Sequence, residues 1–306
     1  MQKTMGAPLA DAPTRPKLSP RRKLDWINIT FMGFVHLMGL AAIVYLATVQ
    51  FSWWTMGLGL LWFAFCGFSI TGGYHRLFAH PCYKAHWSVR AFHLFFGAGS
   101  FQNSALKWCS DHRIHHSKTD DHHDDPYSIS RGFLWAHIVW IFYQSGRNEE
   151  IRAVKDLQAD PLVRFQHRFY VPLGIVAGFL VPAAIGFAWG DPIGALMVAG
   201  FLRLTFQWHA TFAVNSVAHT IGTQPYCSKG SARDSFITAL VTLGEGYHNF
   251  HHRFQLDYRN GVRWYQFDPT KWAIWSLSKV RLTRDLRRTP EDVIQRAKQA
   301  VAAGKA

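Results

Sequence analysis

Long runs without a charged residue are the feature that most restricts how this chain can fold. No residue from 26 to 49 carries a formal charge, and a second uncharged run covers residues 51–74. A helix over the first run is about 36 Å long at 1.5 Å per residue, which is enough to cross the apolar layer of a bilayer. With 49% hydrophobic and only 17% charged residues in the chain, these runs predict an integral membrane protein.

Two further runs, residues 169–189 and 192–214, complete the set of predicted spans. The connections at residue 50 and at residues 190–192 are so short that each pair of runs can only form a helical hairpin. We therefore expect an all-α fold in which four transmembrane helices, arranged in two hairpins, carry a cytoplasmic helical cap. The expected regions are a basic segment over 1–25, a membrane domain over 26–272 and a basic helical tail over 273–306.

The positions of the basic residues predict the orientation of the chain in the membrane. Six lysines and arginines precede the first run, whereas the two hairpin turns carry none. Because cytoplasmic segments are enriched in Lys and Arg, we expect both termini and the segments 75–168 and 219–306 to be cytoplasmic. The amino-terminal segment is polar and the run behind it is too long for a cleavable signal, so the first helix is expected to remain as an anchor.

Shorter segments carry weaker signals. Residues 91–106 and 132–144 are apolar but shorter than a span, so we expect both to lie in the membrane interface. A final helix is expected behind Thr289 and Pro290, and the basic residues 281–288 before it favour contact with anionic lipid headgroups. The four cysteines form no C-x-x-C pair, and we expect them to be reduced thiols.

Histidine is the residue type in which function is best sought, because 17 histidines stand against four glutamates. Two pentapeptides share one spacing, HRIHH at residues 112–116 and HNFHH at residues 248–252. Offsets of three and four residues return to one face of a helix, so each pentapeptide can direct three imidazoles to one point. Both pentapeptides fall on the predicted cytoplasmic side, which indicates that they are two halves of one site.

Three more histidines belong with these pentapeptides. His75 and His80 lie where the second span reaches the cytoplasm, and their offset of five predicts that the helix ends or bends between them, before Pro81. Asn215 and His219, four residues apart, are expected to project from a cytoplasmic continuation of the fourth span. Nine imidazoles suit iron, copper or zinc better than magnesium or calcium, and they are enough for two metal ions.

The other histidines are expected to be ordinary surface or core residues: His36, His86, His93, His137, His167 and His209. His122 and His123 lie in the acidic hexapeptide DDHHDD at residues 120–125. That hexapeptide is either a network that supports the metal ligands or a solvated acidic loop. Arg203 within the fourth span either snorkels to the surface, has a partner in the bundle, or marks an error in the boundary of the span.

From about residue 51 to 272 the chain resembles the integral-membrane fatty acid desaturases, and among them the delta-9 branch that includes the stearoyl-CoA desaturases. The matching segments are HRLFAH (75–80), FQNSALKWCSDHRIHH (101–116), WHATFAVNSVAH (208–219) and GEGYHNFHH (244–252). The resemblance implies that two iron ions are bound by His75, His80, His112, His115, His116, His219, His248, His251 and His252, with Asn215 holding a metal-bound water.

The same resemblance implies roles for residues beside the metals. Gln102, Trp108 and Thr211 are expected to line the bend of an acyl tunnel, and Asn103 and Asp111 to lie near the substrate headgroup. Glu245 is better interpreted as orienting a histidine than as a ligand, because the chain has too few glutamates for a carboxylate-bridged di-iron bundle.

The implied reaction inserts a cis double bond, at delta-9, into a saturated acyl chain with dioxygen and two electrons. The chain has no haem, iron–sulfur or dinucleotide motif, so a separate donor is expected, such as cytochrome b5 or ferredoxin with its reductase. Acyl-CoA and acyl-lipid substrates remain open, as does a hydroxylase or ketolase reaction on the same scaffold; a metal transporter is a remote alternative. Membrane lipids are expected partners, nucleic acid is not, and a bacterial inner membrane is the expected location.

Overall fold

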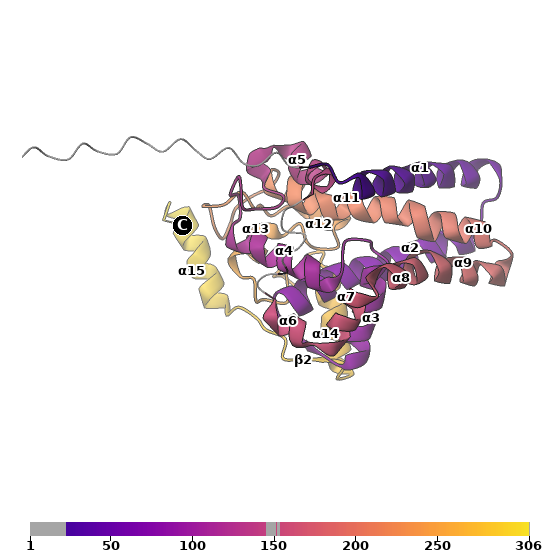
Figure 1. Ribbon diagram of the computed structural model, residues 1–306. Helices are drawn as coiled ribbons and strands as arrows, with labels where there is room; N and C mark the ends of the chain where they lie inside the picture. Colours follow the sequence, from indigo (N-terminus) through magenta and orange to yellow (C-terminus); the bar gives the residue numbers. More distant parts are fainter. Residues whose placement is uncertain (1–22, 145–150, 152–153, 306) are drawn as a thin grey trace, which may run out of the picture.

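The computed structural model describes residues 23–144, 151 and 154–305, and these are predominantly helical. Long helices run side by side in a bundle, and shorter helices form a cap at one end of it (Figure 1). The expected all-α architecture is therefore confirmed, with one small addition. Two short strands, β1 (Lys84–Ala85) and β2 (Thr283–Arg284), form an antiparallel ribbon.

Three helical stretches are long and apolar enough to cross a membrane: Trp26–Thr48, Trp53–Ala79 and Tyr170–Trp189. The first is α1, which begins where the Asp25 carboxylate accepts a hydrogen bond from the Asn28 amide. The second is α2 (Trp53–Phe68) and its π-helical continuation η1 (Ser69–Ala79), so it extends five residues beyond the predicted end at 74. The third consists of α8 (Tyr170–Ile175), η4 (Val176–Leu180), α9 (Val181–Gly186) and η5 (Phe187–Trp189).

The fourth predicted span is also helical, although it is not among the stretches that qualify by length and apolarity. It consists of α10 (Pro192–Ala195), η6 (Leu196–Leu202), α11 (Arg203–Ser216) and η7 (Val217–His219). It packs closely on the first two helices, since a Cβ added at Gly39 of α1 or Gly59 of α2 would lie 2.8 Å from Thr205 or Val198. Whether it crosses the membrane remains a prediction from the sequence.

The rest of the described chain forms the cap and the connections. Its helices are α3 (Trp87–Ala98), α4 (Ala105–Ser117), η2 (Ile129–Arg131), α5 (Phe133–His137), η3 (Val139–Phe142), α6 (Lys155–Ala159), α7 (Pro161–Arg168), α12 (Phe236–Val241), α13 (His248–Arg253), α14 (Pro269–Lys279) and α15 (Glu291–Ala302).

The structure adds detail to three expectations about the cap. Residues 91–106 belong to two helices, because α3 ends at Ala98 and α4 begins at Ala105, and their place in the membrane interface stays a prediction. Residues 132–144 form only the short helices α5 and η3. Helix α14 runs across the predicted boundary at 272, and β2 pairs with β1, so the tail packs on the same body. The final helix does begin behind Pro290, but no side chain caps it.

The four cysteines are free, as expected, and three of them are buried. Of the predicted amino-terminal segment, residues 1–22 lie outside the described part of the chain.

Of the alternatives for Arg203, the structure bears out a set of partners in the bundle, and the side chain does not snorkel to the surface. Its side chain is 3% exposed. The guanidinium donates hydrogen bonds to the carbonyls of Gly99 (2.9 Å), Gly178 (3.2 Å) and Ala199 (2.9 Å), and to Gln207 Oε1 (3.1 Å). A buried cation with this many oxygen acceptors is stabilised in place, and it joins three segments of the bundle.

Replacing Arg203 by alanine is expected to lower the free energy of unfolding by about 2–4 kcal/mol, because buried carbonyls lose their donor and a cavity remains. The measurement is unfolding of the detergent-solubilised protein, with Arg164→Ala on the exposed surface of α7 as the control. Equal stability of the two variants would contradict a structural role for Arg203.

Candidate metal centre

The nine histidines of the sequence motifs gather in two groups at the junction of bundle and cap. In each group the candidate ligand atoms lie within 4.8 Å of one another. The first group contains His75, His80, His112, His116 and His251, and the second contains His115, His219, His248 and His252. None of the six histidines expected to be ordinary residues belongs to either group.

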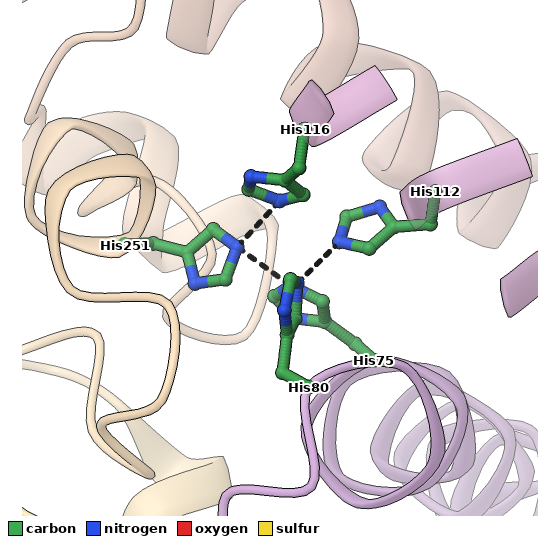
Figure 2. Close-up of side chains that lie close together, drawn as sticks. All are labelled: His75, His80, His112, His116 and His251. Atoms are coloured by element: carbon green, nitrogen blue, oxygen red, sulfur yellow. Dashed lines mark hydrogen bonds between the residues drawn. The ribbon is translucent and has the colours of Figure 1, made fainter. Parts of the chain in front are cut away.

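The five imidazoles of the first group point to a common centre (Figure 2). His75 and His80 come from η1 and the residue that follows it, where the His80 amide donates to the His75 carbonyl, at 3.1 Å. The helix ends at Ala79, between the two histidines, as the sequence predicted. Before that end it is a π-helix, whose hydrogen bonds span five residues, and His80 at its C-cap joins the same group as His75.

Each histidine pentapeptide contributes to both groups. Helix α4 directs the pair His112 and His116 to the first group and His115 to the second, whereas α13 directs His248 and His252 to the second and His251 to the first. The expectation that each pentapeptide aims three imidazoles at one point was therefore wrong. On a helix, side chains four residues apart point in directions that differ by about 40° around the axis. A side chain three residues away points about 60° to the other side, so it reaches the neighbouring group of histidines.

The Nε2 atoms are the ones that converge. In the first group the Nε2–Nε2 distances are 3.0 Å for His75–His251, 2.8 Å for His80–His112 and 2.9 Å for His251–His116. In the second group they are 3.0 Å for both His248–His219 and His252–His248.

Several Nδ1 atoms face hydrogen-bond acceptors on the outside of the groups. His75 Nδ1 lies 2.9 Å from Glu245 Oε2, His115 Nδ1 lies 3.0 Å from both oxygens of Asp125, and His219 Nδ1 lies 2.6 Å from Ser231 Oγ. An Nδ1 that donates its proton to such an acceptor leaves a lone pair on Nε2 in the neutral ring. These tautomers therefore turn Nε2 lone pairs toward the centre of each group.

Burial favours the neutral form of most of these imidazoles. It lowers the pKa well below the ordinary value of 6.5 for His112, His116, His219, His248, His251 and His252, and the neighbouring imidazoles lower it further. A neutral imidazole is the form that binds a metal ion.

The two groups fit metal ions. Nitrogen ligands at about 2.1 Å from one ion, at right angles to each other, are about 3 Å apart, and the Nε2 separations have this size. Lone pairs at such distances repel one another unless protons or a cation lie between them. Neutral nitrogen donors in this number suit iron, copper or zinc, so the site can hold one ion in each group.

A buried network behind η1 holds His75. Glu245 accepts from Arg76 (3.0 Å) and from Asn260 (2.8 Å), and Arg76 also pairs with Asp268 at 3.0 Å. Burial disfavours the charge on Glu245, but the nearby His75 and Arg76 outweigh it and lower the pKa of Glu245. Glu245 therefore stays ionised against the Nδ1 atom of His75, in agreement with the interpretation from the sequence that it orients a histidine.

A cavity of 730 Å³ connects the bundle to the histidine groups. Its wall includes every residue for which the resemblance implied a role in substrate binding or water-mediated metal binding: Gln102, Asn103, Trp108, Asp111, Thr211 and Asn215. Residues of both groups, His112 of the first and His248 of the second, also line it. The cavity size lies within the roughly 300–1,000 Å³ that is usual for small-molecule sites.

The contacts of these wall residues are specific. Gln102 Nε2 donates to Thr211 Oγ1 at 2.9 Å, and the Trp108 ring stacks on His112 with centroids 4.8 Å apart. Asp111 accepts from the buried Lys107 at 2.5 and 2.7 Å. The apolar lining was not predicted from the sequence. It includes Phe31, Phe101, Phe179 and Phe212, whose convergence on one cavity depends on how distant helices pack.

The remaining histidines have other contacts. His36, His209 and His137 form a chain of ring contacts at 3.1 and 3.0 Å that links α1, α11 and α5. His122 and His123 are exposed. The sequence left open what the hexapeptide at residues 120–125 does. In the structure its outer aspartates, Asp120 and Asp125, are the residues that reach the histidines of the second group.

A helical bundle with apolar spans, an internal cavity and two histidine groups defines a membrane-embedded metalloprotein. Residues 51–283 match the family model described as fatty acid desaturase, and the chain belongs to this family. It is 40% identical to Acyl-CoA desaturase 1 of Saccharomyces cerevisiae, over 90% of this chain and 54% of that protein. It is 42% identical to the probable acyl-CoA desaturase of Schizosaccharomyces pombe, over 90% of this chain and 57% of that one.

The match to a mammalian relative covers more of the relative. The chain is 35% identical to stearoyl-CoA desaturase 5 of Bos taurus, over 94% of this chain and 86% of that protein. The chain thus spans a little over half the length of the two fungal relatives and most of the bovine one.

His112→Ala and His252→Ala, one from each group, are each expected to reduce the metal bound per chain while leaving a folded, membrane-inserted protein. The physical reason is that each substitution removes one nitrogen donor from one centre only. His36→Ala is the matched control and is expected to bind as much metal as the native chain. Elemental analysis of the purified proteins is the measurement, and equal metal loss in all three variants would contradict the ligand assignment.

Acid is expected to destabilise the metal-free protein as the pH falls below about 6.5. The buried imidazoles have lowered pKa values in the folded protein, so below the ordinary value of 6.5 the unfolded chain binds more protons than the folded one. Stability is therefore retained above pH 6.5 and is lost progressively below it. Melting temperatures across pH 5–8 test this, and a melting temperature that rises toward pH 5 would exclude it.

Proposed function

We propose that the protein is a membrane fatty acid desaturase that inserts a cis double bond, at delta-9, into a saturated acyl chain. The observation that carries the proposal is the cavity whose wall runs from apolar residues of the bundle to both histidine groups. A flexible acyl chain fits a largely apolar cavity that leads to the histidine groups. The names of the relatives, acyl-CoA and stearoyl-CoA desaturases, support the same reaction.

The residues of this chain position the acyl chain and exclude water from the site. Methylene groups along an acyl chain differ little in reactivity, so the site of reaction is selected by where the cavity holds each carbon. The Gln102–Thr211 hydrogen bond joins the α3–α4 connection to α11, and Trp108 packs between the cavity and His112. These contacts fix the part of the wall nearest the histidines, where the chain must bend or stop.

We assign iron to both histidine groups, with the nine histidines as ligands and Asn215 holding a metal-bound water. When bound, the iron ions supply the activation of dioxygen that breaking an unactivated carbon–hydrogen bond requires. The protein contributes neutral nitrogen donors, held by Glu245 and other acceptors at Nδ1, in a site from which bulk water is largely excluded. Half-buried Asn215 in the cavity wall is consistent with a contact through water.

The topology that we propose has four membrane spans, with both termini, the cap and the metal centre on the cytoplasmic side, in a bacterial inner membrane. The helix from Pro192 to His219 supplies the fourth span, and the buried hydrogen bonds of Arg203 allow a charged residue within it. The exposed arginines Arg281, Arg284, Arg287 and Arg288 then lie on the side of the anionic headgroups. A carboxy-terminal reporter active only in the cytoplasm tests this orientation.

For the headgroup, acyl-CoA is favoured over acyl-lipid by the names of the relatives. Asn103 and Asp111 lie in the cavity wall at the level of α4, together with Tyr143 and Gln144. Among the described residues, no Lys or Arg lines this cavity, so the wall itself offers hydrogen bonds rather than cations to a headgroup. Competition between acyl-CoA and phospholipid substrates in vesicles, followed by product analysis, distinguishes the two.

Expression in a host that lacks its own desaturase is expected to produce a new cis monoene, because the host supplies acyl chains and an electron source. Gas chromatography with mass spectrometry of the fatty acid methyl esters identifies the product and locates the double bond. The monoene is expected to be absent with His252→Ala and present with His36→Ala. Hydroxy acids in place of the monoene would assign the chain to hydroxylation instead.

Desaturation with dioxygen consumes two electrons per turnover, and we propose that a separate acidic protein supplies them, such as cytochrome b5 or ferredoxin with its reductase. With a net charge of +14 the chain attracts an acidic partner at long range. The apparent kcat/KM for such a donor is therefore expected to fall as salt is raised from 0.02 to about 0.2 M, while kcat at saturating donor changes little. A kcat/KM that does not depend on salt would remove the electrostatic part of the proposal.

A further inference from the structure

The hexapeptide at residues 120–125 brings two carboxylates to the second histidine group. We propose that Asp125, and Asp120 acting through Ser231, are positioning residues that fix the imidazoles of His115 and His219 for metal binding. The inference rests on the proposed function, because it assumes that these histidines are metal ligands. It assigns the hexapeptide to the four-histidine group and gives the role to its two outer aspartates.

Asp125 is the more direct of the two. It is 1% exposed, and both of its oxygens lie 3.0 Å from His115 Nδ1. The carboxylate is itself held by the amides of Asp120 and Tyr127, each at 3.2 Å. The ring of Tyr127 packs on His115 with centroids 4.7 Å apart, so the imidazole is held at its edge and on its face.

Asp120 acts through a hydroxyl. Its Oδ2 accepts from the Ser231 amide at 2.8 Å, and its Oδ1 accepts from the Ser231 hydroxyl at 2.5 Å. Because that hydroxyl proton is donated to the aspartate, the Ser231 oxygen is the acceptor for His219 Nδ1, 2.6 Å away. Asp120 has a φ of +67°, a left-handed conformation that aspartate tolerates better than most residues.

The effect of these contacts follows from the chemistry of imidazole. An acceptor at Nδ1 selects the tautomer whose Nε2 carries the lone pair, fixes the plane of the ring and raises the basicity of Nε2. In the second group, His115 has such an acceptor directly from this segment, and the acceptor of His219, Ser231, is held by it, whereas the corresponding carboxylate of the five-histidine group is Glu245, at His75. The four-histidine group therefore depends on residues 120–125 for its affinity, and the five-histidine group does not.

The same hexapeptide provides matched controls. Asp121 and His122 are exposed, and Asp121 accepts hydrogen bonds from the amides of His123 and Asp124 within the turn. Asp121→Asn and His122→Ala therefore change the charge or the imidazole content of the loop without touching His115 or His219.

The test is a chelator titration of the purified, iron-loaded protein, with iron per chain and the melting temperature of the metal-free form measured for each variant. In Asp125→Asn and in Asp120→Asn, one of the two iron ions is expected to be lost at about 10–100-fold lower chelator concentration, and the other at the native concentration. Ser231→Ala is expected to act in the same direction, and Asp121→Asn and His122→Ala to match the native chain.

The outcomes separate the inference from the proposed function. Native-like iron retention in Asp125→Asn and Asp120→Asn would overturn the inference while leaving desaturation intact. Equal weakening of both iron ions, together with a lower melting temperature of the metal-free form, would also overturn it, since a general loss of fold then explains the result. A native chain that binds no iron yet inserts correctly would overturn the inference and the proposed function together.

Discussion

Nitrogen lone pairs that face each other across about 3 Å inside a protein need a proton or a metal ion between them, and the rest of this structure depends on that constraint. Burial favours the neutral form of most of the imidazoles, and acceptors at Nδ1 turn the Nε2 lone pairs of His75, His115 and His219 inward. The protein therefore builds its centre almost entirely from uncharged donors. Three carboxylates lie behind the imidazoles, on the Nδ1 side, where they orient the rings: those of Glu245, Asp125 and Asp120.

The sequence predicted those features of the protein that depend on the local spacing of residues. The three apolar stretches were located to within a few residues, and the nine histidines that share a spacing or a side do gather together. The end of the helix between His75 and His80 was also predicted, but the form of the helix was not. Residues 69–79 are π-helical, and no propensity of these residues signals that change of register.

Contacts between segments that are far apart in the chain could not be predicted from the sequence. The pentapeptides HRIHH and HNFHH divide their histidines between two groups because α4 and α13 face each other, which is a matter of packing. Likewise, the sequence indicated that the hexapeptide DDHHDD can support the metal ligands, but it did not show through which residues. In the structure the outer aspartates make the contacts. Ser231, which completes the second contact, lies 111 residues from Asp120 and has no local signature.

The carboxy-terminal segment also closes the cap over the histidine motifs at residues 75–80 and 248–252. The Arg287 amide donates to the Cys82 carbonyl just beyond His80, the Arg287 carbonyl accepts from the Tyr258 amide, and Ile294 of α15 packs near Phe250 between the ligands of α13. Synthesis proceeds from the amino terminus, so the early hairpin can enter the membrane long before this segment exists. Assembly of the centre is therefore a late event: a nascent chain holds its first histidines in an open, unfinished cap, and metal can be enclosed only after the segment from β2 to α15 has been synthesised.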